Sequence, residues 1–91
     1  MKRTGEMKTS LKILTFAWVR TQTGEPEFTI DTDAESVGKL LDDLLAHREN
    51  WASLSSRRSE IRCAIDQCLA EFDSPLKNAK EVAFFPPITG G

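Results

Sequence analysis

Apolar side chains recur along this chain at two spacings, one typical of a helix and one typical of strands. Five of them fall at positions i, i+3, i+4, i+7 and i+8 and would share one face of an α-helix: Val37, Leu40, Leu41, Leu44 and Leu45. Thr32 and Glu35 precede them at the spacing of a capping box, in which both side chains bind free N–H groups of the first turn. We therefore expect one main helix, capped by Thr32.

Other segments show the alternation, or the β-branched and aromatic content, of strands. Residues 11–20 predict a first strand, and residues 27–30 predict its hairpin partner after a turn that contains Gly24 and Pro26. Three further strands are expected later in the chain, at residues 61–65, 68–72 and 81–86.

The first strand would carry apolar side chains on both faces. Ile13 and Val19 would lie on one face, and Leu14, Phe16 and Trp18 on the other. The helix can cover only one face of the sheet. Two explanations are therefore open: a partner covers the second face, or the strand bends near Ala17 and the chain buries both sets itself.

Residues 49–60 are irregular and contain three serines, which argues against a long helix. Trp51 and Leu54 are expected to anchor this segment to the core. The resulting order of two strands, one main helix and three strands predicts an α+β fold with a mixed sheet packed on the helix. We expect the last strand in the interior of the sheet, so that the chain after it leaves from a rigid base.

The chain ends on an apolar strand, two prolines and two glycines. Pro86 and Pro87 lack N–H groups, so they end the strand and keep the chain extended. Four residues follow them: Ile88, Thr89, Gly90 and Gly91. These four can reach about 13 Å, and the two glycines have no Cβ, so a thin tail with a free carboxylate could enter a narrow tunnel in another protein. The alternative is an ordinary frayed chain end.

The segment Glu81-Val-Ala-Phe-Phe-Pro-Pro-Ile-Thr-Gly-Gly91 resembles the C-terminus of the MoaD-like small subunit of molybdopterin synthase, a ubiquitin-like sulfur carrier. The resemblance extends to residues 63–76 and 11–20 and covers most of residues 11–91. The ending Phe-Phe-Pro-Pro-x-x-Gly-Gly is specific, whereas Gly-Gly alone would not be. The segment Asn78-Ala79-Lys80 departs from the family, which usually has a glycine and acidic residues there, but Asn78 can adopt the left-handed conformation of such a turn.

The resemblance implies a ubiquitin-like β-grasp fold, with about five strands packed on one main helix. It divides the chain into a flexible N-terminal extension (residues 1–10), a β-grasp domain (11–87) and an extended diglycine tail (88–91).

The resemblance also implies a carrier that is not an enzyme by itself. An E1-like adenylating enzyme would use ATP to form an acyl-adenylate at Gly91, and a sulfur donor such as a cysteine desulfurase would convert it to a thiocarboxylate. Gly90 would leave room for both steps. The large subunit of molybdopterin synthase, in a complex of two small and two large subunits, would supply the catalytic groups and use the sulfur for the molybdopterin dithiolene. No cofactor bound to this chain is expected.

Phe84 and Phe85 would point to opposite faces of the last strand, so that one lies in the core and the other can face a partner, and we expect Phe85 to be the one that faces it. Phe85, Phe16 and Leu69 would form an apolar cluster of the kind that dominates binding energy at interfaces. The four residues after Phe85 would complete the interface: Pro86, Pro87, Ile88 and Thr89. The alternative is that Phe85 is simply buried.

Composition and charge exclude several classes of function. The chain of 91 residues has a net charge of −2 and no dense basic patch, which argues against nucleic-acid binding. We expect no membrane span and no signal peptide, and therefore a cytoplasmic protein. Cys63 and Cys68 are too few and too far apart for a redox pair or zinc site, so we expect core or surface thiols and no metal site.

Three other functions also fit a free diglycine end. A sulfur carrier for thiamine thiazole synthesis is the first, although the Phe-Phe-Pro-Pro ending speaks against it. A ubiquitin-like modifier joined through Gly91 to lysines is the second, and covalent high-mass adducts in cell extract would favour it. A noncovalent interaction domain is the third, and full activity without Gly91 would favour that.

Overall fold

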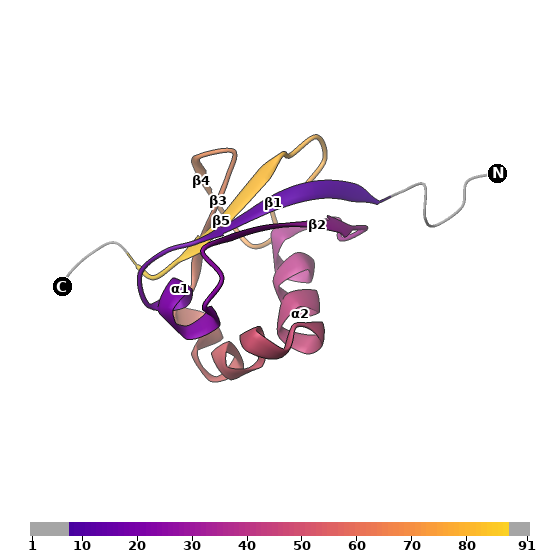
Figure 1. Ribbon diagram of the computed structural model, residues 1–91. Coiled ribbons are helices and arrows are strands. Elements are labelled where there is room, and N and C mark those ends of the chain that lie inside the picture. The colour runs from indigo at the N-terminus through magenta and orange to yellow at the C-terminus, as the bar shows by residue number, and fades with distance from the viewer. Residues whose placement is uncertain (1–7, 88–91) are drawn as a thin grey trace.

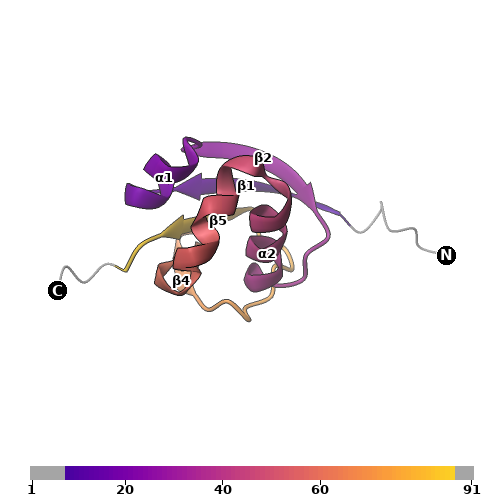
Figure 2. The same cartoon turned by 90° about the horizontal axis from the view of Figure 1, so that it is seen from below.

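A mixed sheet with helical segments on one of its faces makes up the structure, a computed structural model that describes residues 8–87 (Figures 1 and 2). The five strands are β1 (Thr9–Thr15), β2 (Glu27–Thr32), β3 (Arg62–Ile65), β4 (Cys68–Ala70) and β5 (Glu81–Phe85). The helical segments are α1 (Ala17–Thr23), α2 (Val37–His47) and the 3₁₀-helix η2 (Glu49–Glu60). The predicted α+β class and five-stranded mixed sheet are confirmed.

The last strand, β5, lies at the centre of the sheet, whose order is β2-β1-β5-β3-β4. It runs parallel to β1 and antiparallel to β3, so that Phe84 lies opposite Thr15 on one side and Cys63 on the other. The outer pairs, β1 with β2 and β3 with β4, are antiparallel. The chain therefore leaves the sheet from an interior strand, as the sequence predicted.

The core lies between the sheet and the helical segments. Phe84 and Trp51 are fully buried, and their rings meet edge to face with centroids 5.7 Å apart. Leu54 and four residues of the predicted apolar face of α2 are buried in the same cluster, and the fifth, Leu45, is partly buried against it. Trp51 and Leu54 thus anchor η2 as expected, although the segment forms a 3₁₀-helix with a kink at Arg57 and is not irregular throughout.

The predicted first strand is wrong in its second half. The strand begins at Thr9 and ends at Thr15, and the chain turns at Ala17, which has a φ of 54°, into helix α1. Gly24, in the left-handed conformation, ends this helix with its N–H bonded to the carbonyl of Arg20. Tertiary packing overrides the strand propensity of this segment, because the helix buries Val19 against the core.

The predicted cap of the main helix is also wrong. Ser36, and not Thr32, is the N-cap, and its hydroxyl accepts the N–H of Lys39. The loop after β4 satisfies the two preceding N–H groups: Val37 donates to the Ser74 carbonyl and Gly38 to the Phe72 carbonyl. This loop explains the error, since a cap assigned from local sequence alone does not include acceptors that arrive from elsewhere in the chain.

Two predicted turn positions adopt the backbone that they need. Asp66 and Gln67, between β3 and β4, both have positive φ, which suits the two-residue turn expected there. Asn78 has a φ of 66°, so it adopts the left-handed turn conformation expected for it. β4 is shorter than predicted and ends at Ala70.

Candidate functional site

The root of the C-terminal tail is built by β5 and the two prolines after it. Phe84 is fully buried on the helix side, and Phe85 is half-buried on the opposite face of the sheet. Pro86 is half-buried and Pro87 is exposed. Because neither proline has an N–H group, strand pairing ends at Phe85 and the chain separates from the sheet.

Small residues on the sheet face away from the helices leave room beside Phe85. Ala64 and Ala83 lie opposite each other on β3 and β5, and Leu69 on β4 lies opposite Ala64. Leu69 is 74% exposed, an unusual position for a large apolar side chain. An exposed leucine beside a half-buried phenylalanine forms an apolar area that suits contact with another protein.

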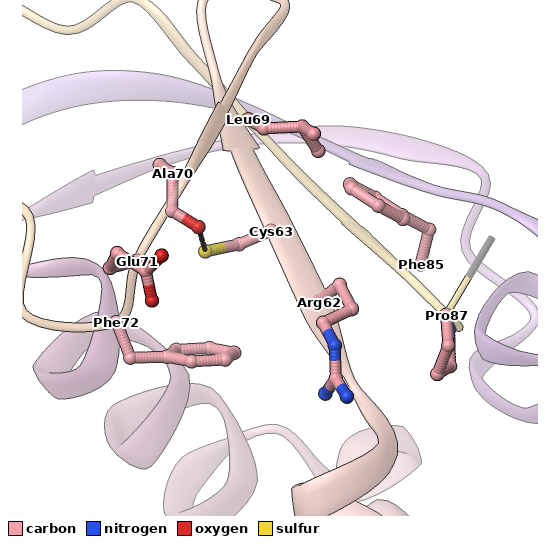
Figure 3. A pocket seen from close by; sticks show the side chains of 8 residues that line it. All are labelled: Arg62, Cys63, Leu69, Ala70, Glu71, Phe72, Phe85 and Pro87. Carbon is pink, nitrogen blue, oxygen red and sulfur yellow. Dashed lines mark hydrogen bonds between the residues drawn. The ribbon is translucent and has the colours of Figure 1, made fainter. Parts of the chain in front are cut away.

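A hollow of about 520 Å³ opens next to this area, and we call it the tail-root hollow (Figure 3). Leu69, Phe85 and Pro87 border it on the side of the tail, and Glu71 and Phe72 border it on the opposite side. Its volume lies in the range of small-molecule pockets, so the hollow is large enough to take side chains of a partner.

The structure brings together part of the predicted partner surface. Leu69, Phe85 and Pro87 meet at the tail-root hollow, whereas Phe16 and Pro86 do not line it. Phe16 is 41% exposed and lies beside the end of β5, where its N–H donates to the Phe84 carbonyl. The predicted tail residues, Ile88, Thr89, Gly90 and Gly91, lie outside the described residues, and their roles stay predictions.

Arg62, Glu71 and Phe72 line the hollow but were not predicted from the sequence. Arg62 reads in the sequence only as an outward polar position of an alternating strand. Glu71 and Phe72 were assigned to a strand that in fact ends at Ala70. Phe72 approaches the main helix at Gly38, whose N–H donates to the Phe72 carbonyl, and nothing in the sequence signals this contact.

The cysteine at the base of the hollow is not a reactive group. Cys63 is buried, and its Sγ lies 3.4 Å from the carbonyl oxygen of Ala70 (Figure 3). Burial, with a smaller contribution from the charge of Glu71, raises the pKa of this thiol to about 11. The thiol is therefore protonated near neutral pH and is a poor nucleophile. Cys63 and Cys68 are a core thiol and a surface thiol, as expected.

Within residues 8–87, no group of three or more histidine, cysteine or acidic side chains is placed to hold a metal ion. The helices of this same part of the chain are all too short or too polar to cross a membrane.

Comparisons with known proteins agree on one family. The model of the ThiS family matches residues 13–91. The molybdopterin synthase sulfur carrier subunit of Escherichia coli is 38% identical over 81 residues, which cover 89% of this chain and 99% of that protein. The protein of the same name from Haemophilus influenzae is 33% identical over the same shares of the two chains.

Solved structures show the same fold. The protein SAMP1 of Haloferax volcanii superposes with a TM-score of 0.72 at 25% identity, over 91% of this chain and 100% of that chain. Subunits 1 and 2 of the molybdopterin-converting factor of Helicobacter pylori form a complex whose matching chain has a TM-score of 0.60 at 21% identity, over 91% and 100% of the two chains. The chain has the ubiquitin-like β-grasp fold and belongs to the ThiS family, as a relative of the MoaD-like sulfur carrier subunits of molybdopterin synthase.

Proposed function

We propose that this chain carries sulfur as a thiocarboxylate on Gly91 and delivers it to the large subunit of molybdopterin synthase. The observation that carries the proposal is the diglycine end that follows the central strand in a chain 38% identical to a sulfur carrier subunit. A carboxylate is a poor electrophile, so the first step must activate it. An adenylating enzyme would use ATP to form an acyl-adenylate on Gly91, with release of pyrophosphate.

Sulfur would then enter from a persulfide on a donor protein such as a cysteine desulfurase. The terminal sulfur attacks the Gly91 carbonyl, and AMP leaves with the electrons of the broken bond. A thiol reduces the acyl disulfide that results, which releases the thiocarboxylate and forms a disulfide on the donor side. Glycine suits both steps, because a side chain at Gly91 or Gly90 would crowd the reacting carbonyl.

The large subunit would bind at the root of the tail and receive the sulfur in its own active site. Phe85, Leu69 and Pro87 would form the contact around the tail-root hollow, and Phe16 would extend it beside the end of β5. Two loaded carriers would act for each dithiolene, because a dithiolene contains two sulfurs. The catalytic groups of the transfer belong, in this proposal, to the large subunit.

Deletion of Gly91 tests the role of the tail. Dithiolene formation in a reaction reconstituted with ATP, adenylating enzyme, sulfur donor and large subunit should be abolished, because the remaining Gly90 carboxylate ends one residue short. A misplacement of this size removes the alignment that the reaction needs. Thermal stability and binding to the large subunit should be retained. Unchanged dithiolene formation by the deletion variant would rule out the carrier mechanism.

Leu69→Ala tests the contact surface with little interference from folding. Leu69 is exposed, so its loss should change the free energy of unfolding by less than about 0.5 kcal/mol. Affinity for the large subunit should fall roughly fivefold or more, as for an apolar anchor of an interface. Thr29→Ala, on the same open face but in β2, is the matched control and should bind normally. Equal affinity of the Leu69→Ala and Thr29→Ala variants would remove Leu69 from the interface.

A role as a protein modifier is the second candidate, because the fold also matches a structure described as small archaeal modifier protein 1 of Haloferax volcanii, at 23% identity. The same acyl-adenylate could be attacked by a lysine amine in place of sulfur. Adducts of this chain in cell extract that survive thiol reduction, and are lost on deletion of Gly91, would support this function.

A further inference from the structure

Arg62 stands between two hollows on one side of the molecule. The tail-root hollow opens on one side of it. A second hollow, bordered by Ser55, Ser59 and Ile61 of the η2 region, opens on the other, and Arg62 and Phe72 line both. A partner segment that crosses the surface from the tail root toward η2 therefore passes Arg62.

The guanidinium of Arg62 forms no ion pair with any acidic side chain among residues 8–87. One terminal nitrogen donates to the carbonyl oxygens of Ser59, at 3.0 Å, and Ile61, at 3.2 Å. These two contacts hold the group in place, while the remaining N–H donors face no protein acceptor in the described residues. A guanidinium has five such donors in a planar fork that matches a carboxylate. Arg62 is thus positioned to receive one.

The neighbouring arginines of η2 differ from Arg62 in this respect. Arg57 forms an ion pair with Glu60 at 2.8 Å, and Arg58 forms one with Asp42. Their charges are balanced inside this chain. Arg62 is therefore the arginine at this surface whose charge is best able to bind a group from outside.

Glu71 restricts where an incoming carboxylate can lie. It borders the tail-root hollow across from Arg62, as Figure 3 shows, and it forms no ion pair with that residue. Its negative charge disfavours a second carboxylate inside the hollow. The carboxylate is expected on the η2 side of Arg62, near Ser59, and the hollow itself is left for an apolar side chain against Leu69 and Phe85.

We infer that Arg62 selects the partner: the large subunit presents an apolar side chain to the tail-root hollow and, next to it, an aspartate or glutamate to the Arg62 guanidinium. The inference rests on the proposed function, because the hollow begins at Phe85 and Pro87, the root of the tail that this subunit must accept. The inference adds the chemical character of the large-subunit segment that binds at this surface. A carboxylate there binds two donors of Arg62, whereas a lysine or arginine would be repelled.

Binding of the large subunit from the same organism to four versions of the full chain tests the inference. Wild type, Arg62→Gln, Arg62→Glu and the control Lys77→Gln are compared for affinity and association rate at low and at physiological salt. Lys77→Gln removes the same charge at a different part of the surface, beside Thr9 and Asp33. Thermal unfolding of each variant checks that the fold is intact.

We expect Arg62→Gln to weaken binding roughly three- to tenfold at low salt, mainly through slower association, and to reduce its salt dependence. Arg62→Glu should weaken it further, and Lys77→Gln should leave it within about twofold of wild type. A single Asp→Lys or Glu→Lys substitution on the large subunit should restore binding of Arg62→Glu while it weakens binding of wild type.

Equal affinities for Arg62→Gln and Lys77→Gln, with wild type bound and active in dithiolene formation, would overturn the inference and leave the proposed function standing. Failure of the wild-type chain to bind the large subunit would overturn the proposed function, and the inference with it.

Discussion

At the scale of single residues, Glu25 connects the turn before β2 to the end of α2 and to η2. Its carboxylate accepts hydrogen bonds from Arg48, at 2.6 Å and 3.2 Å, and from the indole N–H of Trp51 at 2.9 Å. The Arg48 guanidinium also lies 3.9 Å from the centre of the Phe28 ring. Trp51 packs in turn against Phe84, so this carboxylate helps to hold the side chains beneath the root of the tail.

The hydrogen bonds from Arg48 are the largest cause that lowers the pKa of Glu25 below its ordinary value of 4.5. Burial opposes this effect, and the Trp51 bond and the charge of Arg48 add to it. A lowered pKa in the folded state means that the ionised group stabilises the fold above pH 4.5, and that this contribution is lost as the pH falls through the folded pKa.

Glu25→Gln should therefore lower the free energy of unfolding by about 1–2 kcal/mol at pH 7, since it replaces charge-assisted hydrogen bonds by neutral ones. The difference from wild type should narrow as the pH falls below 4.5. Urea unfolding at several pH values measures it. Glu60→Gln, which breaks an exposed pair with Arg57, is the control and should have a much smaller effect. A difference for Glu25→Gln that grows on acidification would contradict this account.

At the scale of elements, the parts predicted best are those whose pattern is local and repeated. Three features can be recognised in the sequence alone: the apolar face of α2, the alternation of side chains in β3, and the two prolines that end β5. Helix α1 was missed because its aromatic and β-branched residues favour a strand. Its helical signals are weak: Val19 and Thr23 lie four residues apart and are both buried, and Gly24 follows as the C-cap. The tail-root hollow was predicted in part, since Leu69 and Phe85 are apolar, whereas Arg62 joins them through strand pairing that the sequence does not display.

The N-terminus of α2 offers a direct test of the cap assignment. Ser36→Ala should destabilise the protein by about 1 kcal/mol, because it removes the side-chain acceptor of the Lys39 N–H. Chemical unfolding measures the change. Ser55→Ala, at an exposed serine of η2, is the matched control and should be close to neutral. Equal stability of the two variants would contradict the cap assignment, because it would show that the Lys39 N–H binds water or another acceptor as favourably as it binds the Ser36 hydroxyl.

At the scale of the whole molecule, the residues that stabilise the fold lie apart from those proposed to bind the partner. The helical segments lie on one face of the sheet, with the core between them and the sheet, and the tail root lies at the end of the central strand (Figures 1 and 2). The apolar area of Leu69 and Phe85 lies on the other face. Substitutions at Glu25 or Ser36 should therefore change unfolding without preventing sulfur loading at temperatures where the protein is folded. Substitutions at Leu69 or Arg62 should change partner binding with little effect on unfolding.

The central claim, that Gly91 carries the sulfur, is tested most directly by the intact mass of the purified chain. The protein is incubated with ATP, the adenylating enzyme of its own organism and a sulfur donor. Its intact mass is then measured by mass spectrometry, and fragmentation locates any change of mass in the chain. The account predicts that one C-terminal oxygen is replaced by sulfur, at Gly91, and that omission of ATP prevents the change. An unchanged mass, under conditions in which the same enzymes load a known sulfur carrier, would contradict it.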